Sequence, residues 1–277
     1  MPEHERIEPP GRAHLRDAEG YSPPIHWFAS SPSFADVVRR YWLPVWSMPD
    51  GTTTAQRVLQ YPVCLIVVAH DYATLVGPST GLSIRRLSGS GWALGAMLQP
   101  AVGAVLLGAP VSSVVDVVMP LQDVPGLAGA ALVERVRTAV HGQPGDPARQ
   151  QTAVSAVEDA LHGLLPVDEE GQLVNKIVEY VETESDVVRV GQVCERFDLS
   201  ERSLQRLAAK RIGLSPKWLI QRRRLHEAAE LLASAKPLAL ARVAAGLGYA
   251  DQSHFTRDFR TVTGLTPGAY AAEPRDS

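Results

Sequence analysis

The sequence predicts an α+β N-terminal domain followed by an all-α region. Short strand-like segments separated by Gly, Pro and Ser dominate the first part, whereas everything after residue 171 has the apolar periodicity of helices. Between them lies a polar break, Val167-Asp168-Glu169-Glu170-Gly171. The length of 277 residues is itself typical of two domains.

The domain boundaries follow from composition. Residues 1–30 are rich in Pro and charge, which indicates a mobile arm. We expect the N-terminal domain over 31–166 and the C-terminal domain over 167–277. The acidic N-terminus and the short apolar runs exclude a signal peptide or a membrane span, and two isolated cysteines suit a cytoplasmic protein.

The N-terminal domain is expected to begin with a short helix capped by Ser33 and to continue as strands. The predicted helix covers 34–42, and the strands cover 56–68, 72–76, 81–87 and 91–98. Helices are predicted over 110–118, 126–140 and 146–165.

An internal repeat is the most informative feature of the C-terminal domain. Apolar residues at i, i+3, i+4 and i+7 start at Val190 and again at Leu240, and each run ends in a turn. Ser200 and Asp251 are placed to cap a second helix in each copy. Each copy then reads Gly-Leu-Ser/Thr-Pro, which ends one helix and starts the next. The repeat predicts two helix-turn-helix units, over about 187–213 and 237–264.

The exposed faces of the second helices predict DNA binding. Arg and Gln recur along them and acids are absent: Arg202, Gln205, Arg206 and Ala209 in the first, Ser253, Thr256, Arg257 and Arg260 in the second. Arg suits guanine and Gln suits adenine in the major groove. Residues 200–260 hold 12 Lys/Arg against 5 Asp/Glu, although the whole chain has a net charge of −3. On the helix that starts at Pro216, Arg222 and Arg223 are either phosphate contacts or partners of Glu227 and Glu230.

Residues 171–270 resemble the DNA-binding domain of the AraC family of bacterial transcriptional regulators. The resemblance is carried by Leu204-Gln205-Arg206, by 213–216, 224–232 and 248–260, and by Thr263-Gly264-Leu265-Thr266-Pro267 with Tyr270. It implies two helix-turn-helix units held by a long helix and reading successive major grooves of double-stranded DNA, with RNA polymerase as a further partner. The implied base-reading residues are Arg202, Gln205, Arg206, Gln252, Ser253, Thr256 and Arg257. The phosphate contacts are expected at Ser215, Arg222, Arg223, Arg260 and Thr266.

The N-terminal domain is similar, from about Tyr41 to Asp116, to a sensor-type domain often joined to this unit, and a cupin-like β fold is expected. Four aromatic residues are predicted to line an apolar effector site: Trp42, Trp46, Tyr61 and Trp92. Ordinary core packing is the alternative role for each. Two roles are open for the helices over 126–140 and 146–165: packing against their own domain, which the loose apolar stripe favours, and forming a surface for a homodimer.

Other chemistry has little support in the sequence. His-x-His, Gly-x-Ser-x-Gly and phosphate-loop motifs are absent, so neither a catalytic site nor a metal or other cofactor is expected. The chain is therefore predicted to be a sequence-specific DNA-binding regulator rather than an enzyme, controlled by a small molecule or a partner. Two alternatives stay open: a ligand-independent dimeric regulator, and an enzyme or metal sensor with an accessory DNA-binding domain.

Overall fold

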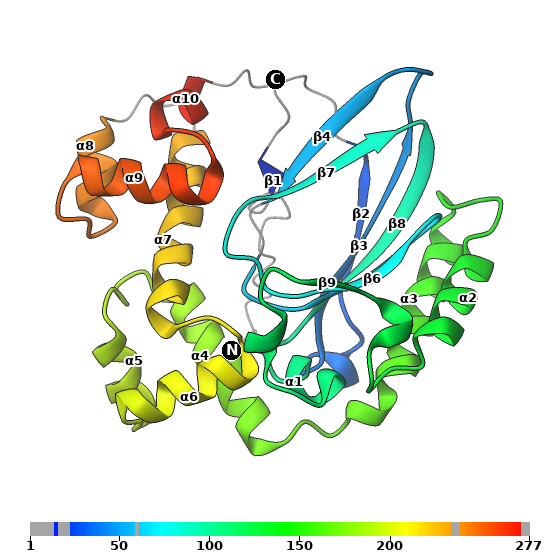
Figure 1. Ribbon diagram of the computed structural model, residues 1–277, viewed down its shortest axis with the longest axis horizontal. Helices are drawn as coiled ribbons and strands as arrows, with labels where there is room; N and C mark the ends of the chain where they lie inside the picture. Colours follow the sequence, from blue (N-terminus) through cyan, green and yellow to red (C-terminus); the bar gives the residue numbers. More distant parts are fainter. Residues whose placement is uncertain (1–13, 16–22, 59–60, 234–238, 273–277) are drawn as a thin grey trace, which may run out of the picture.

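The chain folds as two parts, a β-rich domain with flanking helices and an all-helical domain, so the predicted fold class is confirmed (Figure 1). The computed structural model describes residues 14–15, 23–58, 61–233 and 239–272. In the described residues, no helix has both the length and the apolar character needed to cross a membrane.

The N-terminal domain contains two antiparallel sheets. The six strands of the larger sheet lie in the order β2 (Ile25–Phe28), β3 (Val38–Ser47), β8 (Ser90–Leu98), β5 (Leu65–Ala69), β6 (Ala73–Val76) and β9 (Val118–Pro120). The three strands of the smaller sheet are β1 (His14–Leu15), β4 (Thr53–Val58) and β7 (Ser83–Ser88).

The larger sheet is covered on both faces. Side chains alternate along its central strands, so each strand contributes residues to the apolar clusters on both sides. Leu65 and Val67 of β5 pack in one apolar cluster with Leu87 of the smaller sheet. Ile66 and Val68 point the other way and pack in the main core. The uninterrupted apolar sequence of β5 therefore serves two separate clusters.

Helices cover the second face of the larger sheet (Figure 1). The main helices are α1 (Gly103–Leu107), α2 (Gly129–Ala139) and α3 (Pro147–Leu161), with short 3-10 turns η1 (Pro32–Phe34), η2 (Val111–Val114), η3 (Leu121–Asp123) and η4 (His162–Leu164). Asp146 caps α3 by accepting a hydrogen bond from the Arg149 amide at 3.0 Å. The predicted helices over 126–140 and 146–165 are confirmed as α2 and α3.

Several predictions for this domain are wrong. Residues 38–47 form β3, although the predicted helix covers the first half of this range, because the strand pairs with β8 and alternate residues such as Tyr41 and Leu43 are fully buried. Residues 56–68 divide between β4 and β5, which belong to different sheets. The segment 110–118 is η2 followed by the start of β9. The expected arm includes β1 and β2, and β2 pairs with β3.

The C-terminal domain is entirely helical in its described residues. Its helices are α4 (Glu169–Thr183), α5 (Val190–Phe197), α6 (Glu201–Arg211), α7 (Pro216–Ala233), α8 (Leu240–Gly246), α9 (Gln252–Thr263) and α10 (Pro267–Ala272). α7 belongs to both halves: Leu219 and Ile220 pack with α4, α5 and α6, whereas Leu225 and Leu232 pack with α8 and α9. A single helix thus holds two small cores together.

Candidate nucleic-acid interface

The first helix pair is α5 and α6. Asp198 ends α5 in the left-handed conformation, with φ 51°, and the Leu199 amide donates to the Cys194 carbonyl at 3.0 Å. The Ser200 hydroxyl accepts a hydrogen bond from the Ser203 amide at 3.1 Å and so starts α6. Val193 and Leu204 are buried in the same cluster, which fixes α6 against α5.

The second helix pair repeats this geometry. Gly248 takes the left-handed position with φ 74°, and the Tyr249 amide donates to the Ala244 carbonyl at 2.9 Å. Asp251 accepts from the His254 amide at 2.8 Å and starts α9. Ala250 is the extra residue in this turn. The structure therefore confirms both the repeat and the longer second turn.

The predicted base-reading side chains lie on open surfaces. Arg202, Gln205 and Arg206 on α6 are exposed. On α9, Gln252, Ser253 and Arg257 are exposed and Thr256 is half-buried. The residues on α9 line a shallow groove together with Arg260, Thr261 and Thr266.

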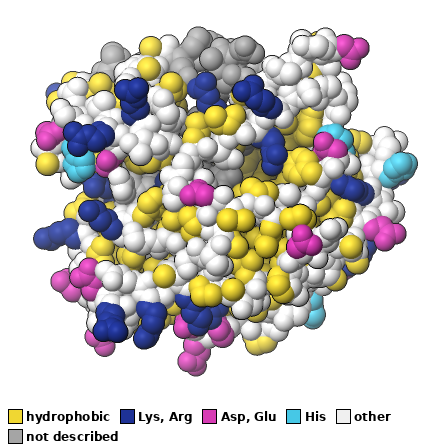
Figure 2. All heavy atoms as spheres, viewed as in Figure 1, with side chains coloured by type: hydrophobic (Ala, Val, Ile, Leu, Met, Phe, Trp, Pro, Cys, Tyr) yellow, Lys and Arg dark blue, Asp and Glu magenta, His cyan; other side chains and the backbone are white. Residues whose placement is uncertain are grey.

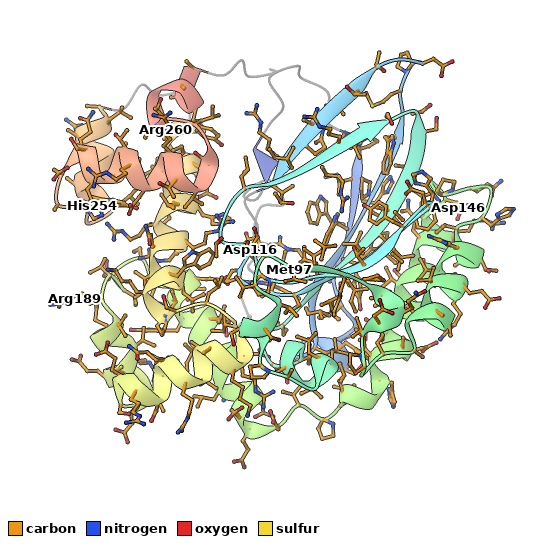
Figure 3. The ribbon with its side chains drawn as sticks, in the orientation of Figure 1. Met97, Asp116, Asp146, Arg189, His254 and Arg260 are labelled. Atoms are coloured by element: carbon orange, nitrogen blue, oxygen red, sulfur yellow. The ribbon has the colours of Figure 1, made fainter. Side chains whose placement is uncertain are left out.

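The two second helices lie near opposite ends of α7 and cross it in a similar direction (Figure 1). His254 and Arg260 of α9 and Arg189 just before α5 lie on the side of the molecule away from Asp146, which caps α3 (Figure 3). Hydrophobic side chains gather instead over the sheets of the N-terminal domain (Figure 2). The labelled residues of α9, His254 and Arg260, thus lie apart from the apolar surface over the sheets.

The predicted phosphate contacts divide into two groups. Ser215 is exposed and caps α7 through the Trp218 amide at 3.1 Å, Arg260 is exposed, and Thr266 is half-buried. The glycines of the two repeated turns differ: a Cβ on Gly213 would lie 3.0 Å from the Val111 carbonyl oxygen of η2, whereas one on Gly264 would meet nothing within 4 Å. The N-terminal domain therefore covers the first turn and leaves the second open.

Arg222 and Arg223 are buried, so their prediction as phosphate contacts is wrong. Arg223 forms an ion pair with Glu227 at 2.6 Å and donates to the Val187 carbonyl at 2.8 Å, which is the alternative that the helical spacing offered. Arg222 lies 5.5 Å from the Trp218 ring centre. Burial lowers the pKa of Arg222 to about 9. Both side chains line a crevice between the domains rather than the outer face of α7.

A clamp around Arg211 was not predicted from the sequence. Arg211, at the end of α6, donates to the Ala101 carbonyl at 2.7 Å, to Asp168 at 2.6 Å and to Glu170 at 2.7 Å. The Asp168 pKa is lowered, because burial, which raises it, is outweighed by hydrogen bonds from Arg211 and the Gly171 amide. The Glu170 pKa is lowered mainly by the hydrogen bond from Lys210. Burial raises this pKa, but the hydrogen bond from Arg211 lowers it further. The clamp joins α6 to both the interdomain segment and the N-terminal domain.

An apolar cavity of about 330 Å³ lies between the two sheets. Trp42, Trp46 and Tyr61 line it as predicted, together with Trp27 and Tyr72. Trp92 does not, because it lies on β8 one residue before Ala93 and therefore faces the main core. Arg40 and Arg85 are the charged residues among those that the structure describes around the cavity. Tyr61 also lines the interdomain crevice, where its ring stacks on His226 of α7 with centres 5.0 Å apart.

The cysteines occupy different settings. Cys64 is buried, and burial raises its thiol pKa to about 12, whereas Cys194 is half-buried. In the described ranges, His, Cys, Asp and Glu side chains form no group of three or more able to hold a metal ion.

Two family models match separate parts of the chain. A family model described as a helix-turn-helix domain matches residues 193–273, and a domain of unknown function, DUF6597, matches residues 26–120. The uncharacterized HTH-type transcriptional regulator YfiF of Bacillus subtilis is 32% identical over 93 residues, which are 34% of this chain and 29% of that protein. The chain thus spans under a third of the curated relative that it matches.

Several solved structures are similar to parts of this chain. The C-terminal domain of the response regulator AraT from Geobacillus stearothermophilus is 26% identical, covering 40% of this chain and 92% of that one, with a TM-score of 0.35. A probable AraC family transcriptional regulator from Rhodopseudomonas palustris is 25% identical, covering 38% and 99%, also with a TM-score of 0.35. ToxT from Vibrio cholerae, bound to an unsaturated fatty acid, is 12% identical, covering 84% and 95%, with a TM-score of 0.42. Residues 193–273 of this chain therefore form a helix-turn-helix domain, which is similar in sequence to a probable AraC family transcriptional regulator.

Proposed function

We propose that the chain regulates transcription by binding a specific sequence of double-stranded DNA. The observation that carries this proposal is the pair of capped helices, α6 and α9, held near the ends of α7 with open stripes of Arg, Gln, Ser and Thr. A helix-turn-helix unit places its second helix in a major groove, and successive grooves on one DNA face are about 34 Å apart. The chain acts by binding rather than by catalysis.

The proposed roles follow from the donors and acceptors of each side chain. Arg202, Arg206 and Arg257 suit the two acceptors of guanine, and Gln205 suits adenine. Gln252, Ser253 and Thr256 make further contacts in the second groove, while Ser215, Arg260 and Thr266 bind phosphates. Arg222 and Arg223 have no role at the DNA surface, since they are buried.

The test is selection of binding sites from random DNA with the full chain at physiological salt. We expect enrichment of one sequence with two contacted blocks about 10 base pairs apart. A variant with both Arg202 and Arg206 changed to Ala should lose the base preferences of one block. Arg135→Ala, which removes an exposed charge on α2, should leave the motif unchanged. Absence of any enriched sequence with the full chain would overturn the proposal.

We further propose that a small apolar molecule in the cavity between the sheets controls DNA binding. The cavity volume of about 330 Å³ and its aromatic lining are suited to such a ligand. Tyr61 offers a route to the DNA-binding domain, because it faces the cavity and also stacks on His226 of α7. A ligand that displaces Tyr61 would therefore alter a contact on the helix that joins α6 to α9.

Ligand binding in the cavity can be tested with 1-anilinonaphthalene-8-sulfonate, a fluorophore with an apolar aromatic body and one sulfonate group. We expect it to quench tryptophan fluorescence and to change DNA affinity. Ala93→Phe, which fills the cavity from β8, should remove both effects, whereas Ala131→Phe on the exposed face of α2 should keep them. If DNA affinity stays constant and the mass of the chain rises with concentration, the ligand-independent dimer is the better description.

A further inference from the structure

Gln205, one of the proposed base-reading residues, already has a partner on the surface of α6. Its amide Nε2 donates a hydrogen bond to Glu201 Oε1 at 3.2 Å. Glu201 is the first residue of α6, and the two side chains are one helical turn apart on the exposed face. The stripe of Arg202, Gln205 and Arg206 contains no acid itself. Glu201 lies directly beside it and contacts Gln205.

This contact changes what the Gln205 amide can offer to DNA. A free glutamine amide carries two N–H donors and one carbonyl acceptor. Adenine presents one acceptor and one donor in the major groove, whereas guanine presents two acceptors, N7 and O6. With one N–H directed to Glu201, Gln205 has one donor and one acceptor left. That pair matches adenine, and it leaves one acceptor of guanine without a donor.

The charge of Glu201 acts in the same direction. A carboxylate beside the reading edge repels the guanine O6 acceptor, whereas its own acceptor atoms match the N6 amino donor that adenine presents at the same position. At the equivalent positions of α9 stand Gln252 and Thr256, so the second unit lacks an acid–amide pair. The effect is therefore expected at one base pair of one half of the binding site.

We propose that Glu201 is a positioning residue that makes Gln205 select adenine over guanine. The inference rests on the proposed function, because it assumes that α6 enters a major groove. An acid in the first turn also stabilises a helix by its interaction with the helix dipole. That structural role would alter stability without altering which base is preferred, so base preference is the readout that separates the two.

The experiment measures base preference at each position of the selected site for the full chain and three variants. Glu201→Ala should lower the adenine-to-guanine preference at one position by roughly tenfold, the scale of one bidentate base contact, and leave the other positions unchanged. Glu201→Gln keeps an acceptor oxygen and should retain a preference for adenine. Glu195→Ala removes an exposed acid from α5 and should leave every preference unchanged. Circular dichroism checks that all variants are folded.

The results distinguish failure of the proposed function from failure of the role of Glu201. If the wild-type chain selects no sequence, the proposed function fails and the inference fails with it. If the wild type selects a two-block site but Glu201→Ala has the same base preferences, the proposed function stands and the inference alone is overturned. Equal loss of the adenine preference in Glu201→Ala and Glu201→Gln would also overturn it, because the hydrogen bond to Gln205 would then contribute nothing and the charge of Glu201 would act alone.

Discussion

Arg206 illustrates how much one residue can contribute to specificity. It is exposed in the second turn of α6 and is four residues after Arg202. We expect Arg206→Ala to lower specific DNA affinity by about 1–3 kcal/mol and to relax the preference at one base pair. Binding isotherms on the selected site and on single-base variants check this, and an unchanged preference at every position would contradict the assignment of Arg206 to base reading.

Arg211 has a structural rather than a reading role. Its side chain is 4% exposed and donates to a backbone carbonyl of Ala101, which is itself buried. Arg211→Met should lower the free energy of unfolding by about 1–3 kcal/mol, the cost of leaving a buried acceptor without its donor. Lys210→Met, which removes only an exposed partner of Glu170, should cost less in the same denaturant titration.

The pH dependence of this clamp follows from the lowered pKa values of Asp168 and Glu170. Both carboxylates titrate below their ordinary values of 3.8 and 4.5 in the folded chain. Their contribution to stability is therefore complete above those values and is lost as the pH falls through the folded-state pKa values. The stability difference between wild type and Arg211→Met should shrink below pH 4.5. Because both carboxylates are about half exposed, the change should be modest; a difference that grows with acidity would contradict it.

At the scale of elements, the turns of the two helix-turn-helix units both need a residue in the left-handed conformation, but they use different residues for it. Asp198 holds the left-handed position in the first and Gly248 in the second. Gly248→Ala should destabilise the chain by about 1–2 kcal/mol, because Cβ is disfavoured at positive φ. Asp198→Gly should change stability by less, since aspartate already tolerates this conformation. Thermal unfolding of both variants checks the pair, and an equal effect of the two substitutions would contradict the argument.

The elements that could be predicted from sequence are those whose signals are local. Capping residues, Gly and Pro at helix ends, and apolar residues at 3.6-residue spacing predict the helices α5, α6, α8 and α9, which the structure confirms. Residues 38–42, the first half of β3, have the sequence pattern of a helix, because their burial as a strand depends on pairing with β8, some fifty residues later. The burial of Arg222 and the Arg211–Ala101 hydrogen bond likewise depend on the N-terminal domain. No local sequence pattern around Arg211 predicts a contact with Ala101, which is 110 residues away in sequence.

At the scale of the whole molecule, the N-terminal domain contacts both halves of the C-terminal domain and the helix α7 that joins them. Val115 packs with the first unit, Leu82 packs with the second, and Tyr61 stacks on His226 of α7 between them. The N-terminal domain is thus in a position to influence both reading helices, which a sequence-based division at residue 167 does not suggest.

This contact predicts coupled unfolding of the two domains. An aromatic pair contributes about 0.5–1.5 kcal/mol beyond burial, so Tyr61→Ala combined with Arg211→Met should weaken the interface from two sides. We expect calorimetry to show one transition for the wild type and two for the double variant. A single transition in the double variant would show that the domains are held together by other contacts.

The length of α7 has a consequence for the DNA itself. Its 18 residues span about 27 Å, while the grooves that α6 and α9 would enter repeat every 34 Å or so on straight B-form DNA. Because α6 and α9 both pack against α7, we expect their spacing to follow its length, and filling both grooves then requires the duplex to curve toward the protein. The bases between the two blocks would then be selected for ease of bending, with flexible pyrimidine–purine steps favoured where no side chain reaches.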